Sequence, residues 1–172
     1  MTDTTDTATT RCPGCGLELV AADAPPTDRY TASPECWQLF GELSAATMGA
    51  ADTEFVHQHC VDAYGAQHAG EDTKPITTVF SLAGLYLSVE HDYTGRQIQQ
   101  AHVTLGEQDR SWPALSPPAD RGDVTVQTVL DATPGDERER AIERWTASVW
   151  RAWDQSHRRI RELCRESLGI DR

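Results

Sequence analysis

The sequence predicts an all-α fold, a single helical bundle that carries an N-terminal zinc-knuckle arm. Stretches with apolar residues at helical spacing recur along the chain, and Ser, Thr, Pro and Gly stand at their ends, as is typical of helix boundaries. The chain is 172 residues long, which is enough for one sizeable core but short for two. A Cys-Pro-Gly-Cys-Gly segment precedes the first of these stretches and is typical of a metal-binding loop.

The N-terminal part of the chain contains no predicted helix. Residues 1–10, MTDTTDTATT, lack apolar periodicity, so we expect a disordered leader followed by one domain over residues 11–172. The Cys-containing loop and a proline-rich connector, AADAPPTDRY, come next. The first helix is then predicted to begin at Pro34, capped by Ser33, and to run to the region of Gly49.

Two further helices are expected in the middle of the chain. One begins after Asp52 or Thr53 and ends at Gly70, because glycine is a natural C-terminal stop. The next starts at Pro75 and continues to about Tyr93. The short link between the first and second helices predicts that these two pack antiparallel.

The helical pattern is weaker in the following segment. Gly95 to Gln108 favours a fourth helix, and RSWPALSPPADRGD is a loop by its Pro and Gly content. Thr125 is expected to open a short helix, VQTVLDA, although DVTVQTV also fits a β-strand.

The last predicted element is a long amphipathic helix. Thr133 is its expected cap and Pro134 its first residue. Apolar residues follow at spacings of three, four or their sum: Ile142, Trp145, Val149, Trp153, Ile160 and Cys164. Charged residues, mostly arginine, occupy the opposite face, where we expect solvent.

Charge and hydropathy exclude several kinds of partner. The net charge of -12 disfavours nucleic acid and anionic membranes, because their phosphates would be repelled. No apolar run reaches the about 20 residues that span a bilayer. The polar, acidic start of the chain does not resemble a secretion signal, so we expect a cytoplasmic protein with reduced thiols.

Five cysteines in such a protein favour metal ligands and ordinary buried thiols over disulfides. Cys12 and Cys15 form a CxxC loop in which proline and glycine permit the tight turn that directs two sulfurs at one ion. A redox pair is the alternative, but redox CxxC motifs usually open a helix within a βαβ pattern, which this sequence lacks.

Tetrahedral zinc needs two more ligands. Counting residues along the first two predicted helices indicates which side chains could supply them. From the turn near residue 51, Cys36 is fifteen positions back and His68 seventeen forward, so antiparallel packing sets them at the same height. The predicted site is therefore Cys12, Cys15, Cys36 and His68 with zinc as cofactor. Alternatively, Cys36 is a small buried hydrophobe and His68 a cation at a helix C-terminus.

A second polar centre is expected from two observations. The second helix carries His57, Asp62 and Tyr64 but few surface charges, and His157 lies on the apolar stripe of the last helix. We expect a cleft in which these four act as acid, base or orienting groups. Its predicted substrate-binding residues are Tyr30 and Trp153. The alternative is a core network in which every polar group is satisfied.

The motifs together resemble an uncharacterised, mostly bacterial family that is numbered 5946 among the domains of unknown function. The stretches that carry the resemblance are CPGCG at 12–16, YTASPECWQLFGE at 30–42, HQHCVDAYGAQH at 57–68 and VWRAWDQSH at 149–157. The resemblance implies that the metal-site and cleft residues, with Trp37, belong to the family pattern, but it implies no activity. The chain departs from that pattern at His59, usually apolar, and Ala69, usually proline.

Three functions follow from these patterns. The first is a small zinc protein whose mainly structural metal ties the arm to the bundle, beside a cleft that binds or converts a small molecule. The second is a non-enzymatic adaptor that uses zinc for folding and the arginine-bearing last helix for a protein partner. The third is a thiol-redox protein acting through the CxxC pair.

Overall fold

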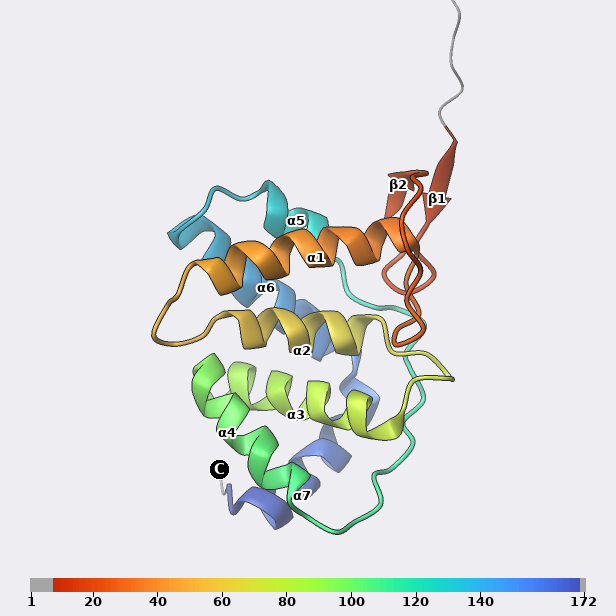
Figure 1. Cartoon of the computed structure of the whole chain (residues 1–172). Coiled ribbons are helices and arrows are strands. Elements are labelled where there is room, and N and C mark those ends of the chain that lie inside the picture. Colours follow the sequence, from red (N-terminus) through yellow and green to blue (C-terminus); the bar gives the residue numbers. More distant parts are fainter. Residues whose placement is uncertain (1–7, 171–172) are drawn as a thin grey trace, which may run out of the picture.

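The computed structural model describes residues 8–170, which are mostly helical with one small sheet (Figure 1). The all-α prediction is therefore supported in outline. The elements in chain order are β1 (Thr9–Arg11), β2 (Glu18–Val20), α1 (Pro34–Gly49), α2 (His57–Gln67), α3 (Pro75–His91), α4 (Gly95–Gly106), α5 (Val126–Asp131), α6 (Asp136–Ala152), the 3-10 turn η1 (Asp154–Ser156) and α7 (His157–Leu168).

The N-terminal arm is a short β-hairpin, which the sequence did not predict. Strands β1 and β2 pair antiparallel, with Thr10 opposite Leu19, and the Cys-containing loop is the turn between them. The sequence predicted a disordered leader over residues 1–10, but Thr9 and Thr10 at its end belong to β1. Residues 1–7 of that leader lie outside the described residues. Glu35 Oε1 accepts a hydrogen bond from the Ala22 N–H (3.1 Å) and joins the segment after the hairpin to α1.

Helices α1 and α2 pack antiparallel, as predicted (Figure 1). The Ser33 hydroxyl caps α1 by accepting from the Cys36 N–H (3.2 Å), and Pro34 is the first helical residue. Facing pairs then recur along the two helices. They are Cys36 with His68, Phe40 with Tyr64, and Thr47 with His57. The two ends of this helix pair are therefore held in one register.

Helix α3 packs tightly on α2 through two glycines. A Cβ atom at Gly84 would overlap the Asp62 carboxylate, and one at Gly65 would overlap the Ser81 hydroxyl. These four positions form two facing pairs, so each helix uses a glycine to admit a polar side chain of the other. Any larger residue at either glycine would separate the helices.

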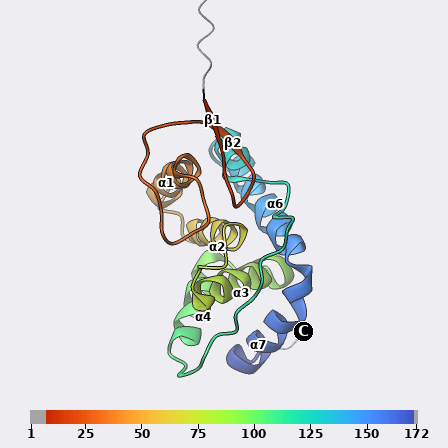
Figure 2. The ribbon, with the colours of Figure 1, turned by 90° about the vertical axis from the view of Figure 1, so that its right-hand side faces the viewer.

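The core lies where α2, α3 and α6 meet. Trp145 is fully buried there, and its Nε1–H donates to Gln67 Oε1 (2.9 Å). The long segment that joins α4 to α5 runs back along one side of the molecule and ends beside the Cys-containing loop (Figure 2). Arg121 fixes it there by donating to the carbonyl oxygens of Gln67 (3.2 Å) and Ala69 (2.7 Å).

The predicted last helix is interrupted. Helix α6 ends at Ala152, and the chain passes through η1 before α7 begins at His157. In a continuous helix the Trp150 carbonyl oxygen would accept from residue 154. It accepts instead from the Trp153 N–H (3.0 Å) and from His157 Nε2 (2.7 Å). The expected cap at Thr133 also differs, since the cap of α6 is Gly135.

Smaller differences concern helix starts. The second helix begins at His57 rather than after Asp52 or Thr53, because Phe55 has a left-handed backbone (φ 57°) that a helix cannot include. The segment after Thr125 is the helix α5, so its strand interpretation was wrong. Within residues 8–170, every helix is too short or too polar to cross a membrane.

Candidate metal centre

Four predicted ligands converge at the end of the α1–α2 pair. One possible ligand atom from each of Cys12, Cys15, Cys36 and His68 lies within 4.8 Å of all the others. Cys36 Sγ is 3.8 Å from Cys15 Sγ and 3.4 Å from His68 Nε2. Cys12, Cys36 and His68 are buried, and Cys15 is half-buried. This Cys3His group could hold a metal ion, and it joins the hairpin arm to both helices.

The hairpin turn brings its two sulfurs toward the helices through backbone hydrogen bonds. The Cys12 N–H donates to the Leu17 carbonyl (2.8 Å), and the Gly16 N–H donates to the Cys12 carbonyl (2.9 Å). Gly16 has φ 76°, a left-handed conformation that glycine adopts without a steric cost. Gly14 lies so close to the Thr31 carbonyl and the His68 ring that a Cβ atom would overlap both. The turn therefore fits this site only with glycine.

His68 is oriented by the backbone behind it. Its Nδ1 lies 2.9 Å from the Tyr64 carbonyl oxygen, and because a carbonyl only accepts, Nδ1 carries the proton. The lone pair of Nε2 is then free on the side of the Cys36 sulfur. The ring also stacks on Tyr64 (centroids 3.9 Å, 21° between planes). A carbonyl that fixes the ring tautomer in this way is typical of metal-bound histidines.

The thiols affect one another electrostatically. Hydrogen bonds from Cys15 and Cys36, in that order, lower the pKa of the Cys12 thiol far below its ordinary value. The neighbouring Cys12 raises the pKa of Cys15 to about 11 and moves the pKa of Cys36 well above its usual range. One thiolate thus suppresses ionisation of the other two. A divalent cation among the sulfurs would remove that repulsion and allow all three to ionise.

Tyr64, predicted as a cleft residue, lies instead against the metal centre. Its hydroxyl donates to Cys36 Sγ (3.7 Å), and its ring is fully buried between His68 and Phe40. Tyr30, predicted to contact substrate, packs edge-on against Tyr64 (centroids 5.6 Å). Trp37 completes this aromatic layer. The layer covers the sulfurs on the α1–α2 side.

His57 and Asp62 occupy separate environments on α2. His57 Nδ1 lies 2.8 Å from the Thr47 hydroxyl at the far end of α1, and burial lowers the pKa of His57. Asp62 is 2% exposed and its carboxylate lies against Gly84 of α3. Its Oδ1 accepts from Gln58 Nε2 (3.1 Å), one turn earlier on α2. Burial raises the pKa of Asp62 well above its ordinary value. These two candidates do not share a partner among the described residues.

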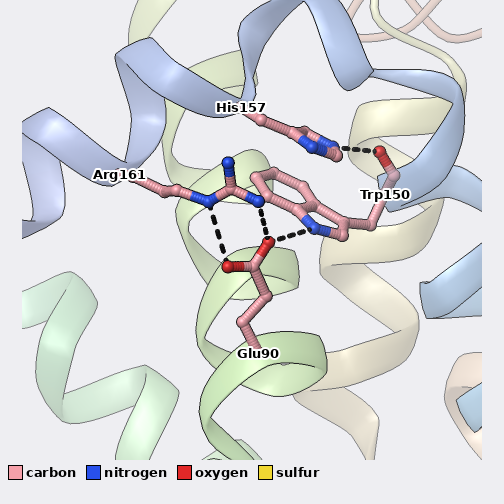
Figure 3. A network of polar contacts seen from close by, with 4 residues as sticks. All are labelled: Glu90, Trp150, His157 and Arg161. Atoms are coloured by element: carbon pink, nitrogen blue, oxygen red, sulfur yellow. Dashed lines mark hydrogen bonds and ion pairs between the residues drawn. The ribbon is translucent and has the colours of Figure 1, made fainter. Parts of the chain in front are cut away.

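His157 lies in a third place, at the junction of α6 and α7 (Figure 3). Its ring stacks on Trp150 (3.8 Å, 13°), and its Nε2 donates to the Trp150 carbonyl. Glu90 accepts from the Trp150 indole (2.9 Å) and from Arg161 Nε (3.0 Å). The structure therefore gives His57 and His157 no common partner, because His57 contacts Thr47 of α1 whereas His157 contacts Trp150 at the end of α6.

Trp153, the other predicted substrate contact, is fully buried. Its indole N–H donates to the Ala66 carbonyl (3.1 Å), so both its ring and its polar atom have partners inside the core. No surface of this ring is available to a substrate. The periodicity correctly placed Trp153 on the buried face of its helix.

Sequence reasoning missed Thr31, which supports the metal centre. Its N–H donates to the His68 carbonyl (2.8 Å), and its side chain packs against Gly70. The only sequence signal for Thr31 was its position between the CPGCG and SPECW motifs, because a single threonine in a connector forms no recognisable pattern. The close contact of Gly14 with Thr31 and His68 was likewise not predicted, because the sequence indicated only that Gly14 lies in a tight turn.

Comparison with known proteins gives one match. Residues 10–154 match the profile described as "Family of unknown function (DUF5946)", which covers most of the chain. The match includes the four candidate ligands and most of the helical bundle. No curated protein and no solved structure matches the chain significantly. The chain therefore belongs to the family of unknown function DUF5946.

Proposed function

We propose that this protein is a small zinc-binding helical protein in which Cys12, Cys15, Cys36 and His68 hold one zinc ion. The observation that carries the proposal is the convergence of three sulfurs and one imidazole nitrogen within 4.8 Å of one another. Thiolate and imidazole ligands in a set of four are typical of zinc. The carbonyl-oriented ring of His68 supports the same assignment.

The proposed role of the metal is structural. Four protein ligands saturate a tetrahedral ion, so no position is left for a water molecule that could be activated for catalysis. The ligands come from the hairpin turn, the first turn of α1 and the residue that follows α2. Zinc would therefore crosslink the arm to the bundle, and its binding energy would contribute to folding.

Two alternatives are less well supported. A thiol-redox role needs an accessible, nucleophilic CxxC thiol, whereas Cys12 is 1% exposed and Cys15 is half-buried. Both thiols also lie beside two further possible metal ligands, Cys36 and His68. An adaptor role would use the arginines of α7, all four of which are exposed: Arg158, Arg159, Arg161 and Arg165. Exposed arginines alone do not identify a protein partner. The zinc proposal is compatible with an adaptor but does not depend on one.

Elemental analysis of the purified protein tests the proposal. We expect about one zinc per chain in the wild type and a large loss of zinc in Cys36→Ser and His68→Ala, because each removes one of four ligands. Full zinc content in both variants would overturn the assignment. In the wild type, a strong chelator should lower the melting temperature, because zinc bound to the folded state stabilises it. An unchanged melting temperature after zinc is removed would contradict the structural role.

A further inference from the structure

A pocket unrelated to the sulfurs lies beside Tyr30 of the aromatic layer. It has a volume of about 360 Å³ and lies among α2, α3, α4 and the connector that precedes α1. Its walls include Tyr30, Gln58, Asp62, Phe80, Ser81 and His102. The volume is within the range of small-molecule sites. The pocket combines two aromatic rings with several hydrogen-bonding side chains.

Asp62 is the most unusual member of this wall. It is 2% exposed, and although Gln58 donates to its Oδ1, its Oδ2 has no hydrogen-bond partner. A buried carboxyl oxygen without a partner is costly in either protonation state, and such groups are rare in folded proteins. Gly84 leaves the space that the carboxylate needs. A donor supplied by a bound molecule would remove this cost.

His102 adds a second acceptor to the wall, beside the Asp62 carboxyl group. His102 Nε2 lies 2.9 Å from the Phe80 carbonyl and therefore carries the proton, which leaves Nδ1 as an acceptor. Burial lowers the pKa of His102 to about 4, so the ring adds no positive charge to the wall at neutral pH. The Gln58 side-chain amide already donates to Asp62. The wall also contains groups that can donate, which are the Arg29 guanidinium and the hydroxyls of Tyr30, Thr77 and Ser81.

The aromatic walls favour a cation with an apolar body. The Tyr30 ring already packs against a cation at the exposed rim, because the guanidinium carbon of Arg29, another wall residue, lies 5.3 Å from its centre. A ligand would therefore use the part of the ring that Arg29 leaves uncovered. Phe80 offers a second ring, stacked on His102 (centroids 5.3 Å). The net charge of -12 also attracts cations to the protein as a whole.

We propose that this pocket binds a small primary amine, whose ammonium group donates to Asp62 while its apolar part packs against Tyr30 and Phe80. This inference goes beyond the zinc proposal and does not require the metal ion to take part. The ammonium group supplies the missing donor, and its positive charge favours the ionised form of Asp62, which burial alone disfavours. An apolar or aromatic substituent fits the rest of the wall.

Calorimetric titration with 2-phenylethylamine tests the proposal, with 2-phenylethanol and phenylacetate as neutral and anionic probes of similar shape. We expect the amine to bind wild-type protein at least about tenfold more tightly than either control, as a charge-assisted hydrogen bond would give. Asp62→Asn should weaken amine binding by a similar factor. The matched control Asp109→Asn removes an exposed carboxylate outside the pocket and should leave binding unchanged.

Three results would overturn the proposal: no binding of the amine, equal binding of phenylacetate, or unchanged amine affinity in Asp62→Asn. Zinc content is measured on each sample, so a failure of the metal proposal is seen separately. If Asp62→Asn does not fold, Ile76→Trp decides instead. Ile76 is exposed and lies in the pocket wall, so a tryptophan there obstructs the pocket without altering the core. Loss of amine binding in that variant supports the proposal, and retained binding contradicts it.

Discussion

His68 and His157 are held by the protein in nearly the same way, yet only one of them lies at a candidate metal site. Each ring stacks on an aromatic residue, Tyr64 or Trp150, and each donates to the backbone carbonyl of that same residue. The difference is the nitrogen that is used. His68 donates through Nδ1 and directs Nε2 toward a sulfur, whereas His157 donates through Nε2.

The surroundings of the two rings complete the contrast. Three thiols meet the free nitrogen of His68, while the network around His157 contains the Glu90–Arg161 ion pair (2.6 Å) and no cysteine (Figure 3). A buried histidine with a well-defined tautomer is therefore not evidence for a functional site by itself. What distinguishes a ligand is a second set of donors from other segments, directed at the same point.

The largest expected difference between the two regions is in their cysteines. Cys36→Ser should lower the free energy of unfolding by more than about 3 kcal/mol, because a ligand and the metal that crosslinks the arm are lost. Cys164→Ser, at an equally buried position in α7, should cost about 1–2 kcal/mol for burying a hydroxyl. Urea denaturation measures both. Equal losses would mean that Cys36 is only a buried hydrophobe.

A smaller effect is expected when the backbone of the metal centre is crowded. Gly14→Ala places a methyl group against the Thr31 carbonyl and the His68 ring and should destabilise the protein by about 1–3 kcal/mol. It should also weaken zinc binding, measured by competition with a chromogenic chelator. Gly41→Ala in α1 meets no atom within 4 Å and should stabilise by about 0.5–1 kcal/mol. An equal loss of stability in both variants would contradict crowding as the cause at Gly14, because nothing lies within 4 Å of a Cβ atom at Gly41.

His157→Leu should affect stability but not metal content. The variant loses the ring stacking on Trp150 and one of two hydrogen bonds to its carbonyl, a cost of about 1–2 kcal/mol. The Trp153 N–H still satisfies that carbonyl, so the fold should persist. Thermal melting and zinc analysis of one preparation give both values. A loss of zinc would show that the two regions are coupled.

The smallest effect concerns the ion pair beside His157. A hydrogen bond from Arg161 lowers the pKa of Glu90, so the stabilisation is present above the unfolded-state pKa of about 4.3 and is lost as pH falls through the lower folded-state pKa. Since the pair is partly exposed, Arg161→Ala should cost no more than about 1 kcal/mol near neutral pH. That cost should decrease as pH falls through the lowered folded-state pKa of Glu90. Arg159→Ala, an exposed change on the same helix, should show no such dependence. A difference that persists at low pH would assign the effect to packing.

The metal-centre end could be predicted from sequence because it depends on local rules. Ser33 and Pro34 set the start of α1, and a short link forces α2 to return alongside it. Cys36 and His68 then face each other by counting alone, and the Phe40–Tyr64 and Thr47–His57 contacts follow the same register. Membership of the family was likewise predicted from the motifs and is confirmed.

The remaining features depend on tertiary contacts that periodicity does not report. Helical spacing placed Trp153 and His157 on the inner side of one helix, but it did not reveal the break at which His157 bonds to Trp150. Helical spacing also does not indicate which helix covers each face of α2. The sequence prediction therefore combined His57, which faces α1, and Asp62, which faces α3, in one cleft. The hairpin was missed because each of its strands has only three residues.

The central claim is that three sulfurs and one imidazole of this chain bind zinc, and X-ray absorption at the zinc edge tests it most directly. For protein purified with its metal, we predict three sulfur neighbours at about 2.3 Å and one nitrogen neighbour at about 2.0 Å. In the zinc that His68→Ala still retains, the imidazole nitrogen should be lost or replaced by an exchangeable water oxygen, while the sulfurs remain. A wild-type spectrum with mainly oxygen neighbours, or one that His68→Ala leaves unchanged, would contradict the assignment.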